Sequence, residues 1–353
     1  MSQNSAFTAS DLSQLPKPTA VEQIDFETLR KEIIDQLSGY SPLLFDGAGE
    51  PVLMQAERYT DETTGEVYFR VPADDQDTLQ YLDREVHPMA RWANVTAYRV
   101  MVERQRFNQR SLGLMLAYSE DDDLDQIGAN FSTPRLVVDH GDPDAIPPRP
   151  KVMEDNESYR RRIQLSPERI STAGPEGSYI YHALSADADV LDANVQTPVF
   201  DLVNGSIVII DDADIYRVKP GHLGINIISR TGDGTALQAL IEKVEAALSD
   251  KKVRPLNDVP VVRSAFIIDY EIDATIETFN GPDSAVIIAE GRKRVEKYVS
   301  DMRRIGMPIY RSMIKAALGV AGVKNVVVNK PASDLIPNQR ECGYCTGITL
   351  TEA

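Results

Sequence analysis

The sequence lacks any long uninterrupted run of apolar residues. No run of about 18 such residues, the length that suggests a membrane-spanning helix, occurs in the chain. The first seven residues, Met-Ser-Gln-Asn-Ser-Ala-Phe, also lack the basic and apolar regions of a signal peptide. We therefore expect a protein that is made and used without secretion through that route.

Basic residues are scarce relative to acidic ones. The 353 residues include 37 Lys and Arg against 54 Asp and Glu, a net charge of −17 at pH 7. Nucleic acids and anionic membranes bind basic surfaces, so neither is expected as a partner. Protein partners or small cationic ligands are favoured instead. The apolar content of 42% is that of a folded protein, and the length favours about two or three domains.

Cysteine is nearly absent. The two cysteines, Cys342 and Cys345, form a Cys-Gly-Tyr-Cys motif. A redox motif would begin a helix beside a strand, and a zinc site would need further ligands. Neither context is visible, so we interpret the pair as ordinary thiols. Sequence motifs of zinc proteases, serine hydrolases and phosphate-binding loops are also missing. We expect no cofactor, no metal ion and no catalytic residue.

Helix-breaking signals are concentrated in residues 153–185. Asn156 can cap a short helix, Ser166-Pro167 starts another turn, and Ala173-Gly174-Pro175 ends the segment and begins a further helix. Helix breaks this close together hold helices at fixed angles. We interpret the stretch as the junction between an N-terminal helical half and a C-terminal α/β half, with Gly174 and Pro175 as candidate pivot residues.

Three consecutive arginines, Arg160, Arg161 and Arg162, lie in the first helix of that junction. Such a cluster can bind phosphate, but acidic residues stand on both sides of it. Ion pairing between the two halves of the protein is therefore the favoured interpretation.

Apolar residues from Phe26 onward fall on one stripe of a helix. This stripe must pack either within the chain or against a partner in a helical bundle, and both possibilities stay open. A second, long helix is predicted over residues 92–119. The candidate partner-interface residues on the two helices are Phe26, Leu29, Ile33, Leu37, Tyr98 and Phe107.

Turn and proline signals divide the remaining chain. A hairpin is expected from strands at 52–54 and 67–69. The proline-rich residues 139–152 predict a stiff linker, with Pro147 and Pro148 as candidate hinge residues. Strands and helices then alternate, which predicts an α+β multidomain fold with helices packed on small sheets.

The expected organisation has six parts. They are an extended arm (1–22), a bundle-forming helical region with a hairpin (23–138), the linker (139–152), a β-rich middle domain with an inserted hairpin at 199–219 (153–233), a C-terminal α/β domain (234–331) and an irregular tail (332–353).

Four segments in this order resemble the baseplate J-like protein family of contractile-tailed phages and related injection systems. The residues that carry the resemblance are Asp25-Phe26 with its helix, Tyr98 to Arg135 with Arg106-Phe107-Asn108, Glu157-Ser158-Tyr159-Arg160 through Ala173-Gly174-Pro175, and Pro220-Gly221 past Arg254-Pro255-Leu256 to Gly322-Val323. The insertion at 199–219 departs from the shorter members of the family.

The resemblance implies a structural baseplate wedge subunit located in the virion tail. Members of the family assemble as two copies with a different wedge protein into a heterotrimer, and their helical parts form an intersubunit bundle. A small wedge protein with a lysozyme-like fold contacts that bundle, and the C-terminal domains join neighbouring wedges around the hub. Rigid-body rotation of the wedges is then expected to trigger sheath contraction.

Two other classes of function stay open. A metal-dependent hydrolase would use aspartate clusters, such as Asp187 with Asp189 or the group Asp211, Asp212 and Asp214. The second alternative is an adaptor subunit of another complex.

Overall fold

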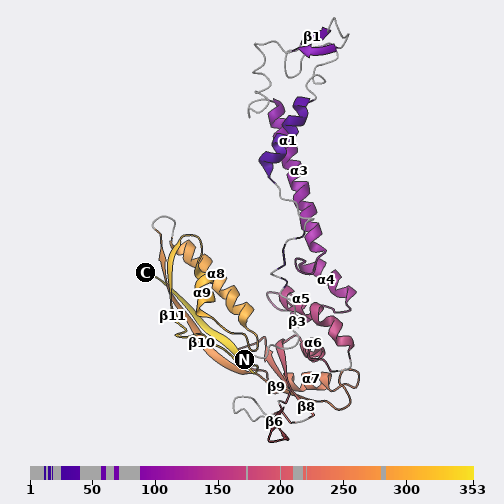
Figure 1. The fold of residues 1–353 in the computed structure, drawn as a ribbon, viewed down its shortest axis with the longest axis vertical. Coiled ribbons are helices and arrows are strands. Elements are labelled where there is room, and N and C mark those ends of the chain that lie inside the picture. The colour runs from indigo at the N-terminus through magenta and orange to yellow at the C-terminus, as the bar shows by residue number, and fades with distance from the viewer. Residues whose placement is uncertain are drawn as a thin grey trace. The chain divides into compact units, whose positions relative to one another are not determined.

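The structure, a computed structural model, describes residues 12, 15, 16, 18, 25–39, 57–60, 67–70, 88–171, 174–198, 200–209, 218–219, 221–279 and 284–353. The chain divides into two compact units, and each is described separately below. One comprises Asp11–Asp123, and the other consists mainly of Leu124–Ala353. Helices and small sheets alternate along the chain (Figure 1), which confirms the predicted α+β multidomain fold.

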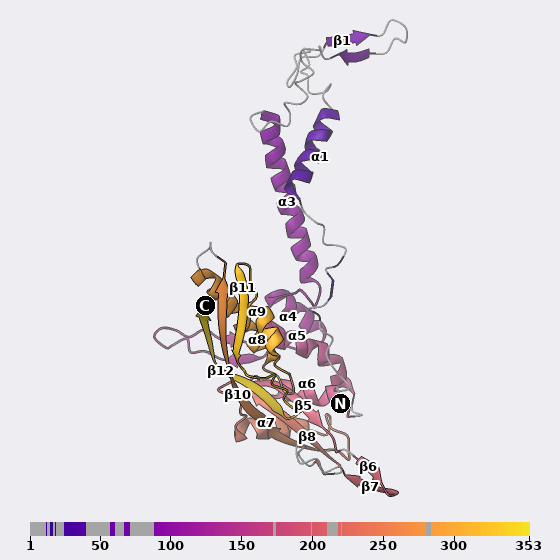
Figure 2. The ribbon, with the colours of Figure 1, turned by 60° about the vertical axis from the view of Figure 1, so that its left-hand side comes forward.

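The first unit is built on two helices, α1 (Phe26–Gly39) and α3 (Pro88–Gly113). Helix α1 lies alongside the N-terminal part of α3 in both views (Figures 1 and 2). Ala93 and Ala97 of α3 are fully buried. Their small side chains let the two helices approach closely. At 26 residues, α3 is about 39 Å long.

Helix α3 is shorter at its C-terminal end than the sequence predicted. It ends at Gly113 rather than Ser119, and the backbone continues in turns in which Met115 N–H donates to Leu112 O at 3.0 Å. Glycine is a poor helix former, which is the physical reason for the earlier end.

A hairpin also lies in the first unit. Strand β1 (Glu57–Thr60) pairs antiparallel with β2 (Val67–Arg70). The partner of the predicted strand at 67–69 is therefore residues 57–60, and the predicted strand at 52–54 lies outside the described residues.

Residues 139–152 form a closed loop rather than a linker. Strands β3 (Val137–Asp139) and β4 (Val152–Met153) pair antiparallel at the two ends of the loop, and Asp142 pairs with Arg149 inside it. The segment therefore returns to the point at which it left the domain. The expectation of a connector between domains was wrong, because the prolines accompany a chain reversal.

The middle domain, residues 124–264, combines helices with one sheet. Its helices are α4 (Asp121–Asn130), which begins just before the domain, α5 (Asn156–Leu165), the 3-10 helix η4 (Ser166–Ile170), α6 (Glu176–Ala186) and α7 (Gln238–Leu248). The three-stranded sheet has the order β5 (Val190–Gln196), β8 (His222–Ser229) and β9 (Val259–Ser264).

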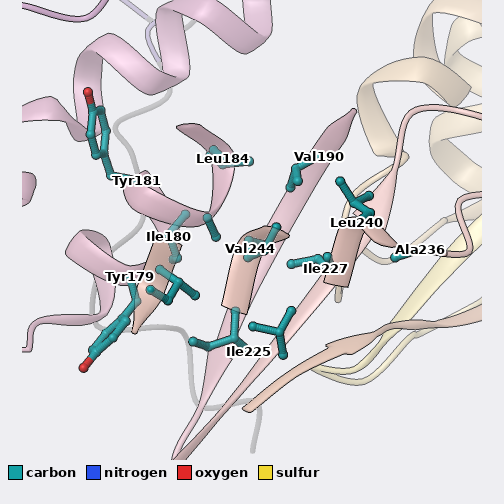
Figure 3. Packing of buried hydrophobic residues seen from close by; sticks show 14 of the residues in the cluster. Tyr179, Ile180, Tyr181, Leu184, Val190, Ile225, Ile227, Ala236, Leu240 and Val244 are labelled. Atoms are coloured by element: carbon teal, nitrogen blue, oxygen red, sulfur yellow. The ribbon is translucent and has the colours of Figure 1, made fainter. Parts of the chain in front are cut away.

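Helices α6 and α7 pack on this sheet around a core that includes Tyr179, Leu184, Ile225 and Val244 (Figure 3). Strand β8 is antiparallel to β5 and parallel to β9, and α7 is the crossover between β8 and β9. The expected domain boundary at 233/234 therefore falls inside one core rather than between two.

A hairpin of β6 (Phe200–Val203) and β7 (Ser206–Ile209) lies within residues 199–219. Its turn residues, Asn204 and Gly205, have φ values of 52° and 79°. Two central residues with positive φ match the right-handed twist of the strands, which is why Asn-Gly is common in such turns.

The C-terminal domain, residues 265–353, is a second three-stranded sheet with the order β11 (Val323–Lys330), β10 (Phe266–Thr278) and β12 (Glu341–Glu352). Helices α8 (Ser284–Met302) and α9 (Arg311–Leu318) cover one face of it (Figure 1). Strand β9 ends at Ser264 and β10 begins at Phe266, so the chain passes from one sheet to the other through Ala265 alone.

The expectation of an irregular tail over 332–353 was wrong. Strand β12 runs parallel to β10 with partners from Phe266↔Glu341 to Ile276↔Glu352. These partners lie far apart in sequence, and short-range patterns do not reveal such pairing. No helix among the described residues is long and apolar enough to cross a membrane.

Candidate functional site

The centre of the junction is a buried ion pair between Arg162 and Glu154. Both side chains are 2% exposed. Nη2 of Arg162 donates to Oε2 of Glu154 at 2.7 Å, and Nε donates to Oε1 at 2.9 Å, so the contact is bidentate. Nη2 also donates to the carbonyl oxygen of Pro134 at 2.7 Å. Such geometry and extra hydrogen bonds are what offset the cost of removing two charges from water.

Tyr159 lies beside this pair. Its ring centroid is 4.6 Å from the guanidinium carbon of Arg135 and 5.6 Å from that of Arg162. Its hydroxyl donates to the carbonyl oxygen of Thr133 at 2.8 Å. A Cβ at Gly128 would lie 1.8 Å from that hydroxyl oxygen, so only glycine fits there. Burial raises the pKa of Tyr159, which keeps this donor protonated.

Helix α5 begins at a different cap from the expected one. Asp155, not Asn156, is the N-cap residue, and its Oδ1 accepts the Ser158 N–H at 2.8 Å. Its Oδ2 accepts from Nη1 of Arg230 at 2.8 Å. Burial alone would raise the pKa of Asp155, but the Ser158 hydrogen bonds and the Arg230 charge outweigh it and lower that pKa.

Arg161 connects three elements through Asp192. Its Nη1 donates to Oδ1 of Asp192 on β5 at 2.5 Å, and Oδ2 of Asp192 accepts the backbone N–H of Ile305 at 2.9 Å. Asp192 is 3% exposed. A single buried carboxylate therefore joins α5, the middle sheet and the C-terminal domain.

Arg160 behaves differently from its two neighbours. Its Nη1 donates to Oε1 of Glu157 at 2.9 Å, within its own helix, and the Glu157 side chain is 71% exposed. Arg161 and Arg162 thus reach other elements, whereas this ion pair of Arg160 is local.

The corner at Gly174 and Pro175 is packed against another loop. Gly174 has a φ of +79°, and a Cβ there would lie 2.8 Å from Cγ of Pro255. Pro175 is the N-cap of α6, and the Tyr179 hydroxyl in that helix donates to Oδ2 of Asp258 at 2.8 Å. The corner is held within the middle domain, and Ala173 lies outside the described residues. Pro147 and Pro148 lie in the closed loop between β3 and β4.

The predicted interface residues differ in how far their side chains are exposed. Leu29 is 5% exposed and packs within the α1–α3 pair, so ordinary intrachain packing holds for it. Phe26 and Ile33 are partly buried, and the Leu37 side chain lies outside the described residues. Tyr98 and Phe107 are each 59% exposed on α3. Nine residues turn an α-helix through about half a rotation, so these two face opposite ways.

Two interface candidates escaped the sequence reasoning. Trp92 is 52% exposed and Val95 60% exposed. With Tyr98 they recur every three residues, and Val102 continues the same side of α3. This side is opposite the buried Ala93 and Ala97, and we call Trp92, Val95, Tyr98 and Val102 the outer stripe. The spacing of apolar residues from Trp92 was the signal that could have revealed it.

Among the described residues, the two cysteines and the pair Asp187 and Asp189 form no recognisable reactive site. Cys342 and Cys345 are free thiols on a strand, and burial raises the pKa of Cys342 to about 12. Asp187 accepts from Lys243 Nζ at 2.7 Å, and Asp189 accepts from the Ser229 hydroxyl at 2.6 Å.

Within the described part of the chain, no cluster of His, Cys, Asp and Glu is arranged to hold a metal ion. Asp211, Asp212 and Asp214 lie outside that part.

Comparisons with known proteins agree with the resemblance seen in the sequence. Residues 85–142 match the Baseplate J-like N-terminal domain, and residues 270–351 match the Baseplate J-like protein C-terminal domain. The chain is 35% identical over 337 residues to Baseplate protein J of Escherichia phage P2, covering 95% of each protein. A chain of the anti-feeding prophage baseplate is similar at 15% identity, with 56% of this chain and 44% of that chain covered and a TM-score of 0.33, which is too low to carry an argument. On the identity and coverage of the phage P2 relative, this chain belongs to the baseplate J-like protein family.

Proposed function

We propose that the chain is a structural wedge subunit of a contractile tail baseplate. The observation that carries this proposal is the 35% identity to a baseplate protein over 95% of both chains. Membership of the family places the protein in the virion tail as a structural component, and we propose that it has no enzymatic activity.

The outer stripe of α3 supports assembly through a helical bundle. Trp92, Val95 and Tyr98 are all more than half exposed although their side chains are large and apolar. One side of α3 is already covered by α1. A helix with apolar residues on two sides is typical of the inner member of a bundle. We propose that a second copy of the chain and a different wedge protein supply the helices that cover the outer stripe.

The junction supports transmission of movement as a rigid block. Helix α5 is tied to other parts of the Leu124–Ala353 unit by two of its arginines. Arg162 bonds to Glu154 and to the carbonyl oxygen of Pro134. Arg161 bonds to Asp192, which also accepts the Ile305 N–H. Buried polar networks of this kind favour one arrangement over alternatives. We therefore propose that the residues around Gly174 stiffen the wedge during contraction instead of acting as a pivot.

Co-expression with the neighbouring tail genes tests the wedge assignment. Native mass spectrometry of the purified complex is expected to give a heterotrimer with two copies of this chain. A chain that purifies alone and leaves the other wedge proteins unassembled would contradict the proposal. Contacts with the hub and with a small lysozyme-like-fold wedge protein are expected in larger assemblies, and omission of each gene in turn tests them.

A further inference from the structure

Helix α3 is basic in a chain that is strongly acidic overall. Its 26 residues contain five arginines and one glutamate, a net charge of +4. The whole chain carries −17, so the residues outside α3 carry −21. Charge of one sign that is gathered on one element favours contact with a surface of the opposite sign.

Four of these arginines lie on the side of α3 that carries the outer stripe. Successive members are eight, seven and four residues apart, and these spacings return to one side of a helix. The second of them, Arg99, also follows Trp92 by seven residues and Val95 by four. The four are Arg91, Arg99, Arg106 and Arg110.

Three of the four have no acidic partner within the part of the chain that the structure describes. The side chains of Arg91, Arg99 and Arg110 are exposed and form no ion pair or hydrogen bond there. Nη1 of Arg106 lies 3.0 Å from Oε1 of Glu103 in the same helix, and these two side chains are 59% and 70% exposed. Exposed pairs of this kind are weak. The guanidinium groups beside the outer stripe are therefore available to carboxylates of a partner.

The charge of α3 opposes pairing with the same helix of a second copy. Two outer stripes that faced each other would bring four arginines against four arginines, and this repulsion grows as water is excluded from the contact. Helix α1 of a second copy is a poor match as well, because it contains three acidic and two basic residues. The covering helix has to bring more carboxylates than either of these helices offers.

The apolar residues of the outer stripe favour a protein over a nucleic acid. Phosphates would pair with the arginines, and bases would stack on Trp92 and Tyr98. Val95 and Val102 contribute nothing to such a contact, whereas with the two aromatic residues they form the continuous apolar side that packs against another helix. The charge of −21 on the rest of the chain also repels a polyanion.

We propose that the outer stripe binds an acidic amphipathic helix of another protein. The apolar side of that helix covers Trp92, Val95 and Tyr98, and its carboxylates, which recur about every seven residues, pair with the arginines beside the stripe. This inference rests on the proposed function, because the different wedge protein is taken as the source of the helix. Charges beside a helical seam determine which partner binds. The arginines thus select the different protein over a second copy at this position.

Charge reversal in the co-expressed complex tests this selection. One full-length variant combines Arg91→Glu, Arg99→Glu and Arg110→Glu, which remove no ion pair from the described part of the chain. It is expected to keep the circular dichroism spectrum of the unmodified chain and to lose the different wedge protein in native mass spectrometry, because carboxylates would then face carboxylates.

A matched control changes the net charge by the same amount away from α3. It combines Arg149→Glu, Lys251→Glu and Lys252→Glu, three exposed positions of the Leu124–Ala353 unit. This variant is expected to keep the complete complex. Loss of the different wedge protein from both variants would show that total charge, not the arginines of α3, governs assembly, and would overturn the inference.

A charge-conserving variant identifies the occupant of the outer stripe. Arg91→Lys, Arg99→Lys and Arg110→Lys keep the positive charges and supply amines that a carbodiimide joins directly to carboxylates in contact with them. Cross-linked peptides of the different wedge protein are expected at these three positions. Cross-links to peptides of a second copy of this chain would overturn the inference. Release of the occupant by nuclease would overturn it as well, because the occupant would then be a nucleic acid.

The outcomes separate this inference from the proposed function. A heterotrimer that forms equally well with the charge-reversal variant and the control would reject the acidic helix and leave the wedge function standing. Absence of the heterotrimer with the unmodified chain would instead reject the proposed function. If the charge-reversal variant loses helicity, the cross-links of the charge-conserving variant decide the question.

Discussion

The buried carboxylate of Asp192 accepts the backbone N–H of Ile305 at 2.9 Å across 113 residues of sequence, while its other oxygen accepts from Arg161. Ile305 also belongs to a small apolar cluster with Ile228, Ala265 and Cys342. The middle and C-terminal domains are therefore joined by the chain crossing, this apolar cluster and the shared carboxylate, and also by hydrogen bonds from Arg303 to the carbonyl oxygens of Arg230 and Gly232. Motion between these two domains would have to break a buried hydrogen bond.

Removal of the Asp192 carboxylate is expected to weaken this coupling. Asp192→Ala leaves the Ile305 N–H and the Arg161 guanidinium without that partner, which costs about 1–3 kcal/mol for the N–H alone. Asp192→Asn retains one acceptor oxygen and should cost less. Urea unfolding monitored separately in each domain checks this. The expected result for the alanine variant is two separated transitions, and a single unshifted transition would show that Asp192 does not couple the domains.

Loss of one partner of the buried ion pair is expected to be severe. Arg162→Met leaves Glu154 buried and charged without its bidentate partner, and breaking such a pair costs about 3–5 kcal/mol. Arg294→Ala removes a pair with Glu290 in which both side chains are about half exposed, and it is expected to cost below about 1 kcal/mol. Chemical denaturation of both variants makes the comparison. Similar losses in the free energy of unfolding would mean that burial does not determine how much the Arg162 ion pair stabilises the protein.

Replacement of Leu29 is expected to damage the chain itself before it affects any partner. Leu29 is 5% exposed, so Leu29→Asp buries a charge between α1 and α3. Circular dichroism should show lower helicity and a lower melting temperature in the isolated chain. By contrast, Tyr98→Asp changes a residue that is 59% exposed. It should leave the melting temperature unchanged and prevent heterotrimer formation, and normal assembly of this variant would remove Tyr98 from the interface.

Substituting two glycines that have the same φ distinguishes backbone strain from steric crowding. Gly174 and Gly205 both have a φ of +79°, but only Gly174 has atoms close to the position of a Cβ. Gly205→Ala is expected to cost only the conformational penalty of about 1–2 kcal/mol. Gly174→Ala adds a clash with Pro255 and should be measurably less stable than Gly205→Ala in thermal unfolding. Equal losses of thermal stability would mean that the Gly174 corner is free to move, which would support Gly174 as a pivot.

Stability at acidic pH should depend on Asp187. Burial acts to raise its pKa, but hydrogen bonds from Lys243 and the Asp189 N–H outweigh it, so the folded-state pKa is lowered from 3.8. A depressed pKa gives stability that is present above the unfolded pKa and is lost as pH falls through the folded value. Asp187→Asn should therefore destabilise the protein at neutral pH and show less further loss below pH 3.8 than the unmodified chain. Melting temperatures between neutral pH and pH 3 measure the difference, and parallel curves would contradict it.

The sequence by itself determined the fold class, the helices and the family. Periodic apolar residues specify α1 and α3, helix-breaking residues mark the Gly174 corner, and the family pattern spans most of the chain. These signals depend on neighbours a few residues apart, where helix and turn preferences act directly. Arg160, Arg161 and Arg162 each form an ion pair. Their sequence does not show that Arg160 pairs with the exposed Glu157, whereas Arg162 pairs with the buried Glu154.

Tertiary structure alone decided where each of those elements packs. Leu29 and Tyr98 look alike as apolar helix residues, yet Leu29 of α1 is buried in the α1–α3 pair whereas Tyr98 of α3 is exposed. The proline-rich segment became a closed loop because β3 and β4 pair, and the C-terminal tail became a strand because β10 lies beside it. In each case the free energy comes from contacts between distant residues, which burial and strand pairing create only once the chain has folded.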